Sequence, residues 1–343
     1  MVEGGWFVRP ASIDDLDAIL DLAGQTGPGF SNLPADRDAL RHRLEWSDRS
    51  FAATLSAPKN ELYVFVLQQA GSGRIGGTAL IFSRIGARVP FYSYKITRLS
   101  QYSRQLDRTV TTEVLNLVND FAGATEVGGL FLMPDLRNAG LGVLLARSRY
   151  LFITLHRERF GELVLTELRG HQEPEGVSPF WEGLARRFFD LEFEEADRFY
   201  ALNGNQFIAD LMPKYPIYTI LLPPEARAAI GRPHRNGVAA MKLLEAEGFR
   251  YDHYVDLFDA GPTMHGAIDD LRTVRDARAA TVELVSGAEA AEPMLLAGGT
   301  LRTFRAMRGR ARFKREDATL RLVEDGLPPG LVMNGERVFF VTR

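Results

Sequence analysis

The segment from residue 125 to residue 160 constrains the fold more than any other part of the sequence. Residues 125–134, TEVGGLFLMP, predict a buried strand, and the apolar run from residue 140 predicts a long helix. The turn between them carries Arg137, Gly140 and Gly142 in an R-x-x-G-x-G spacing. A strand, a glycine-containing turn and a helix in this order indicate an α/β protein.

This turn has the composition of an anion-binding loop. Glycine lets the backbone approach a ligand closely, and the N–H groups in the first turn of a helix have no partner within the helix. Arg137 and the positive end of the helix dipole would attract a phosphate, so the pyrophosphate of coenzyme A is a suitable ligand. Gly140 and Gly142 also fit a plain tight turn. A dinucleotide fingerprint and a P-loop do not fit the spacing.

The other elements predict a mixed sheet flanked by helices. A strand at 6–9 precedes an amphipathic helix that begins after Pro10, and two β-rich runs at 63–67 and 75–86 are typical of a hairpin. A strand at 162–170 and a helix at 179–190 follow the glycine turn.

The length of 343 residues favours two domains, because single hydrophobic cores stop growing at about 250–300 residues. From about residue 270 the sequence changes to short β runs separated by glycine and proline. We predict a main α/β domain at 1–270, with a core at about 6–195 and an extension at 196–270. A small barrel-like β domain is predicted at 271–343.

Composition excludes several function classes. The formal net charge is −3, so no overall positive field favours nucleic acid or an anionic membrane. The chain has no cysteine, which excludes thiolate metal sites and a protein thioester intermediate. The N-terminus lacks the pattern of a secretory signal and no apolar stretch approaches the roughly 20 residues of a membrane span. A cytoplasmic protein is expected.

Several segments then resemble a known superfamily and a narrower family. The opening FVRPASIDDLDAILDLA, the loop FLMPDLRNAGLG and the later SPFWEGLARRFF resemble, in this order, parts of GNAT acyltransferases. Further stretches, among them TGPGFSNLPAD, FIADLMPKYPIYTILLP and EGFRYDHYVDLFDAGPT, are similar to the arginine N-succinyltransferase family over much of residues 8–265. The resemblance implies an enlarged GNAT domain followed by a small β domain.

The resemblance also implies a reaction and a set of ligands. The family passes a succinyl group from succinyl-CoA, its co-substrate, to the α-amine of arginine, and ornithine is an alternative acceptor. Because the chain lacks cysteine, we expect direct transfer in a ternary complex. The family includes paired, non-identical subunits, so a homo-oligomer or a hetero-oligomer with a related subunit is expected.

The acyl-CoA contacts implied by the resemblance lie on the predicted strand and loop. The backbone N–H of Leu130 is the expected donor to the thioester oxyanion, because a leucine side chain is inert. The remaining expected contacts are Leu132, Arg137, Asn138, Gly140 and Gly142.

Catalytic candidates come from the titratable residues. The chain has six histidines, and His234 in IGRPHRNG matches the family's proton donor. Without the resemblance, a histidine flanked by arginines is typical of a surface loop. Arg232 and Arg235 are expected to lower the pKa of His234 and keep it neutral, which favours a base or relay. No histidine spacing indicates a metal site, so none is expected.

Two residues of the ELRG segment are candidates for substrate binding. A guanidinium calls for a carboxylate and a succinyl carboxylate calls for a cation, so Glu167 and Arg169 are expected at the cleft, the former also as a catalytic group. An ordinary ion pair between them is the alternative. The acidic run at 190–197 is expected to be mainly a solvated helix face.

Two other functions stay open at this stage. The same fold could acetylate a different amine, because the loop recognises coenzyme A and not the acyl group. A non-catalytic module that binds acyl-CoA, or a partner subunit, is the second alternative.

Overall fold

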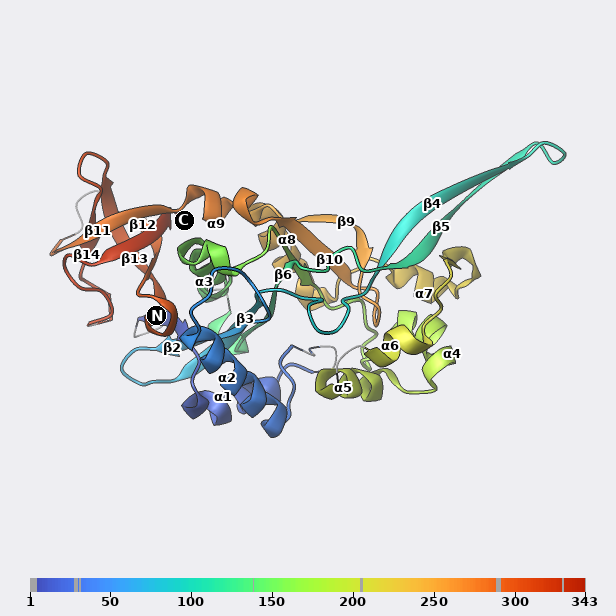
Figure 1. Ribbon diagram of the computed structural model, residues 1–343, viewed down its shortest axis with the longest axis horizontal. Helices are drawn as coiled ribbons and strands as arrows, with labels where there is room; N and C mark the ends of the chain where they lie inside the picture. Colours follow the sequence, from blue (N-terminus) through green and yellow to red (C-terminus); the bar gives the residue numbers. More distant parts are fainter. Residues whose placement is uncertain are drawn as a thin grey trace.

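The computed structural model describes residues 5–27, 30, 32–137, 139–203, 206–287, 291–328 and 330–342. Within these residues, fifteen strands form one hydrogen-bonded ladder with helices packed on it (Figure 1). The strand order is β12-β15-β11-β14-β13-β1-β2-β3-β6-β7-β10-β9-β4-β5-β8. No helix of the described part is long and apolar enough to cross a membrane.

The central strands carry helices on both faces. Strand β2 reads LYVFVLQQ because alternate side chains point into two different cores. Tyr63 and Phe65 pack toward α3, whereas Val64 and Val66 pack with residues of α1 and α2. These elements are β1 (Trp6–Pro10), α1 (Leu16–Ala23), α2 (Arg37–Ala52), β2 (Leu62–Gln69), β3 (Ile75–Phe82), β6 (Thr125–Leu132), α3 (Leu141–Leu155), β7 (Leu163–Glu167), β9 (Arg250–Val255) and β10 (Pro262–Ala267).

A long hairpin projects from the far end of this body. Its two strands pair along their full length from Ser93–Val118 to Ser103–Arg108, and only their basal residues also pair with β9 and β8. Figure 1 shows the arm standing clear of the molecule. The elements are β4 (Ser93–Ser103), β5 (Arg108–Val118) and β8 (Ile217–Tyr218).

A helical layer packs near the base of the arm. The predicted helix at 179–190 is a π-helical turn at Trp181–Ala185 followed by α4 (Arg186–Phe189). Trp181 is fully buried, with its ring stacked 5.4 Å from that of Phe258 and 5.5 Å from that of Phe189. The other helices of this layer are α5 (Phe193–Asn203), α6 (Gln206–Leu211) and α7 (Pro224–Ala229). Helix α8 (Val238–Glu247) packs through Leu244 into the core beside α3.

The predicted C-terminal barrel is confirmed. After α9 (Arg272–Asp276), five strands close a ring in which β12 pairs with both β15 and β13. The start of β13 also pairs with β1, which joins the barrel to the central sheet. The division at residue 270 stays a prediction. The strands are β11 (Arg278–Val285), β12 (Glu292–Gly298), β13 (Arg305–Lys314), β14 (Thr319–Val323) and β15 (Arg337–Thr342).

Candidate active site

The centre of the sheet opens between two parallel strands. Strands β6 and β7 pair at Thr125–Val164 and Glu126–Leu165, and no further pair of described residues links them. From there the strands separate, and a cavity of about 510 Å³ lies between their carboxyl ends. The carboxyl ends of parallel strands are a common position for ligand sites, because loops and helix N-termini gather there.

A β-bulge shapes the β6 wall of this cavity. Thr78 of β3 pairs with Phe131, and Leu80 pairs with Gly128. Two residues of β6, Gly129 and Leu130, therefore lie opposite the single residue Ala79 of β3. Gly129 has a φ of +54°, and a Cβ there would lie 2.6 Å from the Leu80 side chain. The position therefore requires glycine. A bulge leaves an extra residue outside the regular ladder, which presents backbone groups of Leu130 to the cavity.

The glycine turn leads into α3 as predicted. Gly140 is left-handed, with φ 70°, and α3 begins at the next residue. Gly142 lies in the first helical turn and lines the cavity, and the nearest protein atom to a Cβ placed there is 3.8 Å away on Leu132. Arg137 is exposed at the cavity mouth. Asn138 lies outside the described residues.

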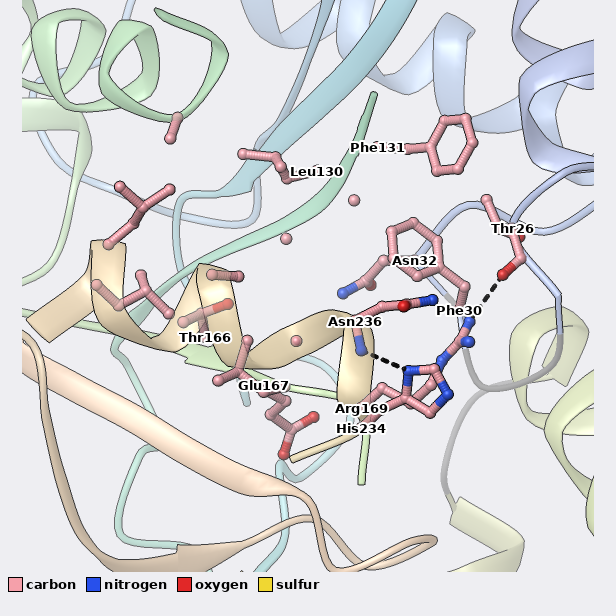
Figure 2. Close-up of a pocket in the computed structure, with 18 of the residues that line it drawn as sticks. Thr26, Phe30, Asn32, Leu130, Phe131, Thr166, Glu167, Arg169, His234 and Asn236 are labelled. Atoms are coloured by element: carbon pink, nitrogen blue, oxygen red, sulfur yellow. Dashed lines mark hydrogen bonds between the residues drawn. The ribbon is translucent and has the colours of Figure 1, made fainter. Parts of the chain in front are cut away.

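The cavity brings the other predicted residues together. Leu130, Leu132, Glu167, Arg169 and His234 all line it. Figure 2 shows Leu130 on one side and Glu167 and His234 on the opposite side. Among the described residues, His234 is the one histidine on the lining.

His234 is held by two hydrogen bonds, one through its backbone and one through its ring. Its backbone N–H donates to the Arg169 carbonyl at 2.8 Å, and its Nδ1 accepts the N–H of Asn236 at 3.2 Å (Figure 2). Burial lowers the pKa of His234, and the charges of Arg169, Arg235 and His171 lower it further. A neutral ring that accepts at Nδ1 carries its proton on Nε2, so His234 is arranged as a donor.

Glu167 belongs to a group of carboxylates at the inner end of the cavity. Burial raises its pKa well above the ordinary value, and the charges of Asp256, Glu126 and Asp259 add to this. Its Oε1 is buried and has no hydrogen-bond partner within the described residues. Burial and Asp256 raise the pKa of Asp259 to about 8, although this carboxylate accepts the N–H of Gly170 at 2.7 Å. Such a group suits a cationic ligand.

Arg169 does not form the alternative ion pair with Glu167. Its Nη2 donates to the Thr26 carbonyl at 2.9 Å, and its guanidinium lies over the Phe30 ring (Figure 2). Part of the acidic run at 190–197 is the solvated face that was predicted, because Glu194 and Glu195 are exposed. Asp197 of the same helix lines the cavity.

Several residues that line the cavity were not predicted from the sequence. Tyr200 faces the same carboxylates, and burial raises its pKa well above the ordinary value. Asp256 and Asp259 lie in the turn DLFDAGP, whose acidic spacing around a glycine is the signal that could have pointed to them. Arg149 and Asn32 come from a helix and a loop far apart in the sequence, and only the fold brings them together.

Comparisons with known proteins agree with this geometry. Residues 6–273 match the family model described as arginine N-succinyltransferase beta subunit. The chain is 42% identical over 276 residues to an arginine N-succinyltransferase of Enterobacter sp., covering 80% of each chain. It is 39% identical over 289 residues to arginine N-succinyltransferase subunit beta of Pseudomonas aeruginosa, covering 84% of each.

A solved structure extends the likeness to the C-terminal barrel. Arginine/ornithine succinyltransferase subunit AI from Pseudomonas aeruginosa is 32% identical, with a TM-score of 0.88 over 99% of both chains. The splayed strands, the bulge and the glycine turn define a GNAT-like acyltransferase fold. The chain belongs to the arginine N-succinyltransferase family.

Proposed function

We propose that this protein transfers succinyl from succinyl-CoA directly to the α-amine of L-arginine, with ornithine as a second acceptor. The observation that carries the proposal is one cavity with a phosphate-binding turn at its mouth and buried carboxylates at its inner end. Donor and acceptor would enter from opposite ends and meet beside Leu130. Membership of the family supports the same reaction.

The donor would bind along the β6 side of the cavity. The first turn of α3 offers unpaired N–H groups to the pyrophosphate, and Gly140 and Gly142 let it approach. Arg137 is exposed beside this turn and would add a cation. The thioester carbonyl would then lie against the N–H of Leu130, which would stabilise the oxyanion.

The acceptor would bind where the carboxylates gather. Asp259 is buried and Asp256 is half-buried, and no cation forms an ion pair with either in the described residues, so a guanidinium would stabilise their charged forms. Arginine and its shorter analogue ornithine both carry a side-chain cation. The α-amine of the acceptor must be neutral to attack.

Glu167 would move a proton and His234 would stabilise the leaving group in this scheme. Glu167 would take a proton from the amine nitrogen, because its raised pKa brings the carboxylate closer to the basicity that this step needs. The new C–N bond forms as the C–S bond breaks. The Nε2–H of neutral His234 would donate a hydrogen bond to the leaving thiolate, which then takes up a proton from solvent. The donor role of His234 replaces the base or relay that the sequence favoured.

We also propose that the chain works in an assembly. Relatives are named subunit beta and subunit AI, which supports pairing with a second copy or with a related subunit. The projecting β4–β5 arm exposes Tyr102, Leu106 and Val110 to solvent, and a two-stranded ribbon is only marginally stable alone. Coenzyme A thioesters are intracellular substrates, so we expect the protein to work in the cytoplasm.

A steady-state assay tests the reaction. Succinyl-CoA and acetyl-CoA are compared as donors, with arginine, ornithine and lysine as acceptors. The proposal requires succinyl transfer to arginine or ornithine to have the highest kcat/KM. Dominant acetyl transfer to another amine would support the first alternative, and binding of acyl-CoA without transfer would support the non-catalytic one.

A further inference from the structure

Arg149 is a buried cation on the cavity wall. Arg149 lies on α3, is 3% exposed as a residue, and lines the cavity. Its two hydrogen bonds go to the carbonyls of Gly128 and Ala146, at 3.4 and 3.3 Å. Its Nη2 donates to no group of the described residues. A buried charge without an ionic partner is costly, so an anion bound in the cavity would stabilise it.

The other arginines near the cavity differ from Arg149 in their partners or in their place. Arg147 pairs with Glu247 at 3.0 Å. Arg159 is equally buried but donates to three oxygens, among them the Tyr63 hydroxyl at 3.1 Å, and it lies away from the cavity. Arg169 donates through Nη2 to the Thr26 carbonyl at 2.9 Å, and it follows β7, on the acceptor side of the cavity. Among these, Arg149 is the buried arginine that contacts β6 on the cavity wall and keeps Nη2 for a ligand.

The position of Arg149 identifies the part of the ligand it would meet. It follows Gly142 by seven residues, or about 10 Å along the helix axis, so it lies well inside the phosphate-binding turn. Its Nη1 contacts Gly128, two residues before Leu130 on β6. The guanidinium therefore lies a short distance from the N–H of Leu130, the proposed oxyanion donor. Succinyl carries its carboxylate two methylenes from the thioester carbon.

We propose that Arg149 binds the terminal carboxylate of the acyl group and selects dicarboxylic acyl donors over neutral ones. This inference rests on the proposed function, because it assumes that the thioester lies at Leu130. A guanidinium and a carboxylate form strong, directional hydrogen bonds, whereas a methyl group at the same place would leave the buried cation unpaired. Arg149 is a binding residue and takes no part in proton transfer.

The α-carboxylate of the amino acid acceptor is the other anion present. The acceptor cation is expected at Glu167, Asp256 and Asp259, on the β7 side of the cavity. Arg149 contacts β6, on the donor side. The observations therefore favour the acyl carboxylate, and the acceptor carboxylate is an outcome that the experiment separates.

The test compares succinyl-CoA with butyryl-CoA, which has the same chain length but ends in a methyl group. Dissociation constants are measured by calorimetry without acceptor, so the result does not depend on turnover. The wild type is expected to bind succinyl-CoA at least about tenfold more tightly, and Arg149→Met is expected to lower this preference by about 10- to 100-fold. Arg137→Met is the matched control, and it should weaken both donors equally.

Three results would overturn the proposal. The first is equal affinity of the wild type for the two donors, and the second is an unchanged preference in Arg149→Met. The third is a loss of kcat/KM in Arg149→Met for arginine but not for argininamide, which lacks the acceptor carboxylate. If Arg149→Met does not fold, Arg149→Lys is measured instead. This variant keeps the charge but loses the planar guanidinium, so an unchanged preference would count against the proposed guanidinium–carboxylate contact. A wild type that prefers succinyl-CoA yet transfers nothing to arginine would refute the proposed reaction and leave the role of Arg149 standing.

Discussion

Replacing Glu167 by glutamine should separate catalysis from stability. The change keeps the size of the side chain but removes its ability to accept a proton. If Glu167 is the base, kcat should fall by about 10²- to 10⁴-fold, equivalent to roughly 3–5 kcal/mol of activation free energy. The assay is steady-state release of free coenzyme A thiol from succinyl-CoA with arginine.

The same variant should fold at least as stably as the wild type. Glu167 has a buried oxygen without a partner and lies among carboxylates, so ionising it in the folded protein is unfavourable. Because its pKa is raised on folding, its contribution to stability is full below the unfolded pKa and is lost as pH rises through the folded pKa. The melting temperature of Glu167→Gln relative to wild type should therefore increase from pH 4 to pH 8.

The pH dependence of activity has the matching direction. Only the ionised carboxylate can accept a proton, so kcat/KM should rise with pH through the raised pKa of Glu167. Glu158→Gln, at an exposed glutamate, is the control and should change neither rate nor stability. A Glu167→Gln enzyme within threefold of wild-type kcat would refute the assignment of the base, whatever its stability.

Three further substitutions probe the donor side. His234→Ala should lower kcat by about 10²-fold or more with the calorimetric affinity for succinyl-CoA kept, and unchanged turnover would remove His234 from the mechanism. Gly142→Val should weaken succinyl-CoA binding at least about tenfold without loss of melting temperature, because the added atoms enter the cavity and not the core. Retained affinity for succinyl-CoA would count against the proposed pyrophosphate site. Arg308 of the barrel donates to the Ala139 carbonyl at 2.8 Å, so Arg308→Ala should weaken coenzyme A binding about 3- to 10-fold by loosening the glycine turn. Unchanged affinity would show that the barrel does not support this turn.

Local patterns predicted the elements that build the donor side. The strand, glycine turn and helix at 125–155 have short-range signals, namely an apolar run, two glycines and helical periodicity. The structure confirms them as β6 and α3. The bulge at Gly129 was not predicted, because its extra residue is defined by pairing with β3, some 50 residues earlier in the chain.

The acceptor side and the arm depend on long-range packing. Asp256 and Asp259 reach Glu167 only because β10 pairs with β7, a contact between residues about 100 apart. The β4–β5 arm lacks a buried face over most of its length, so the alternation that marks a half-buried strand is weak there. The helix predicted at 179–190 contains a π turn, in which Gly183 packs closely against Ala226 of α7, a long-range contact that local periodicity does not record.

Mass spectrometry of the reaction products tests the central claim most directly. The purified protein is mixed with succinyl-CoA and arginine, and released thiol is compared with the amount of arginine succinylated on its α-amine. Direct transfer in the β6–β7 cavity predicts one thiol for each N-succinylarginine, with both lost together in Gly142→Val. Thiol release without succinylated arginine, or an undiminished product in Gly142→Val, would contradict it.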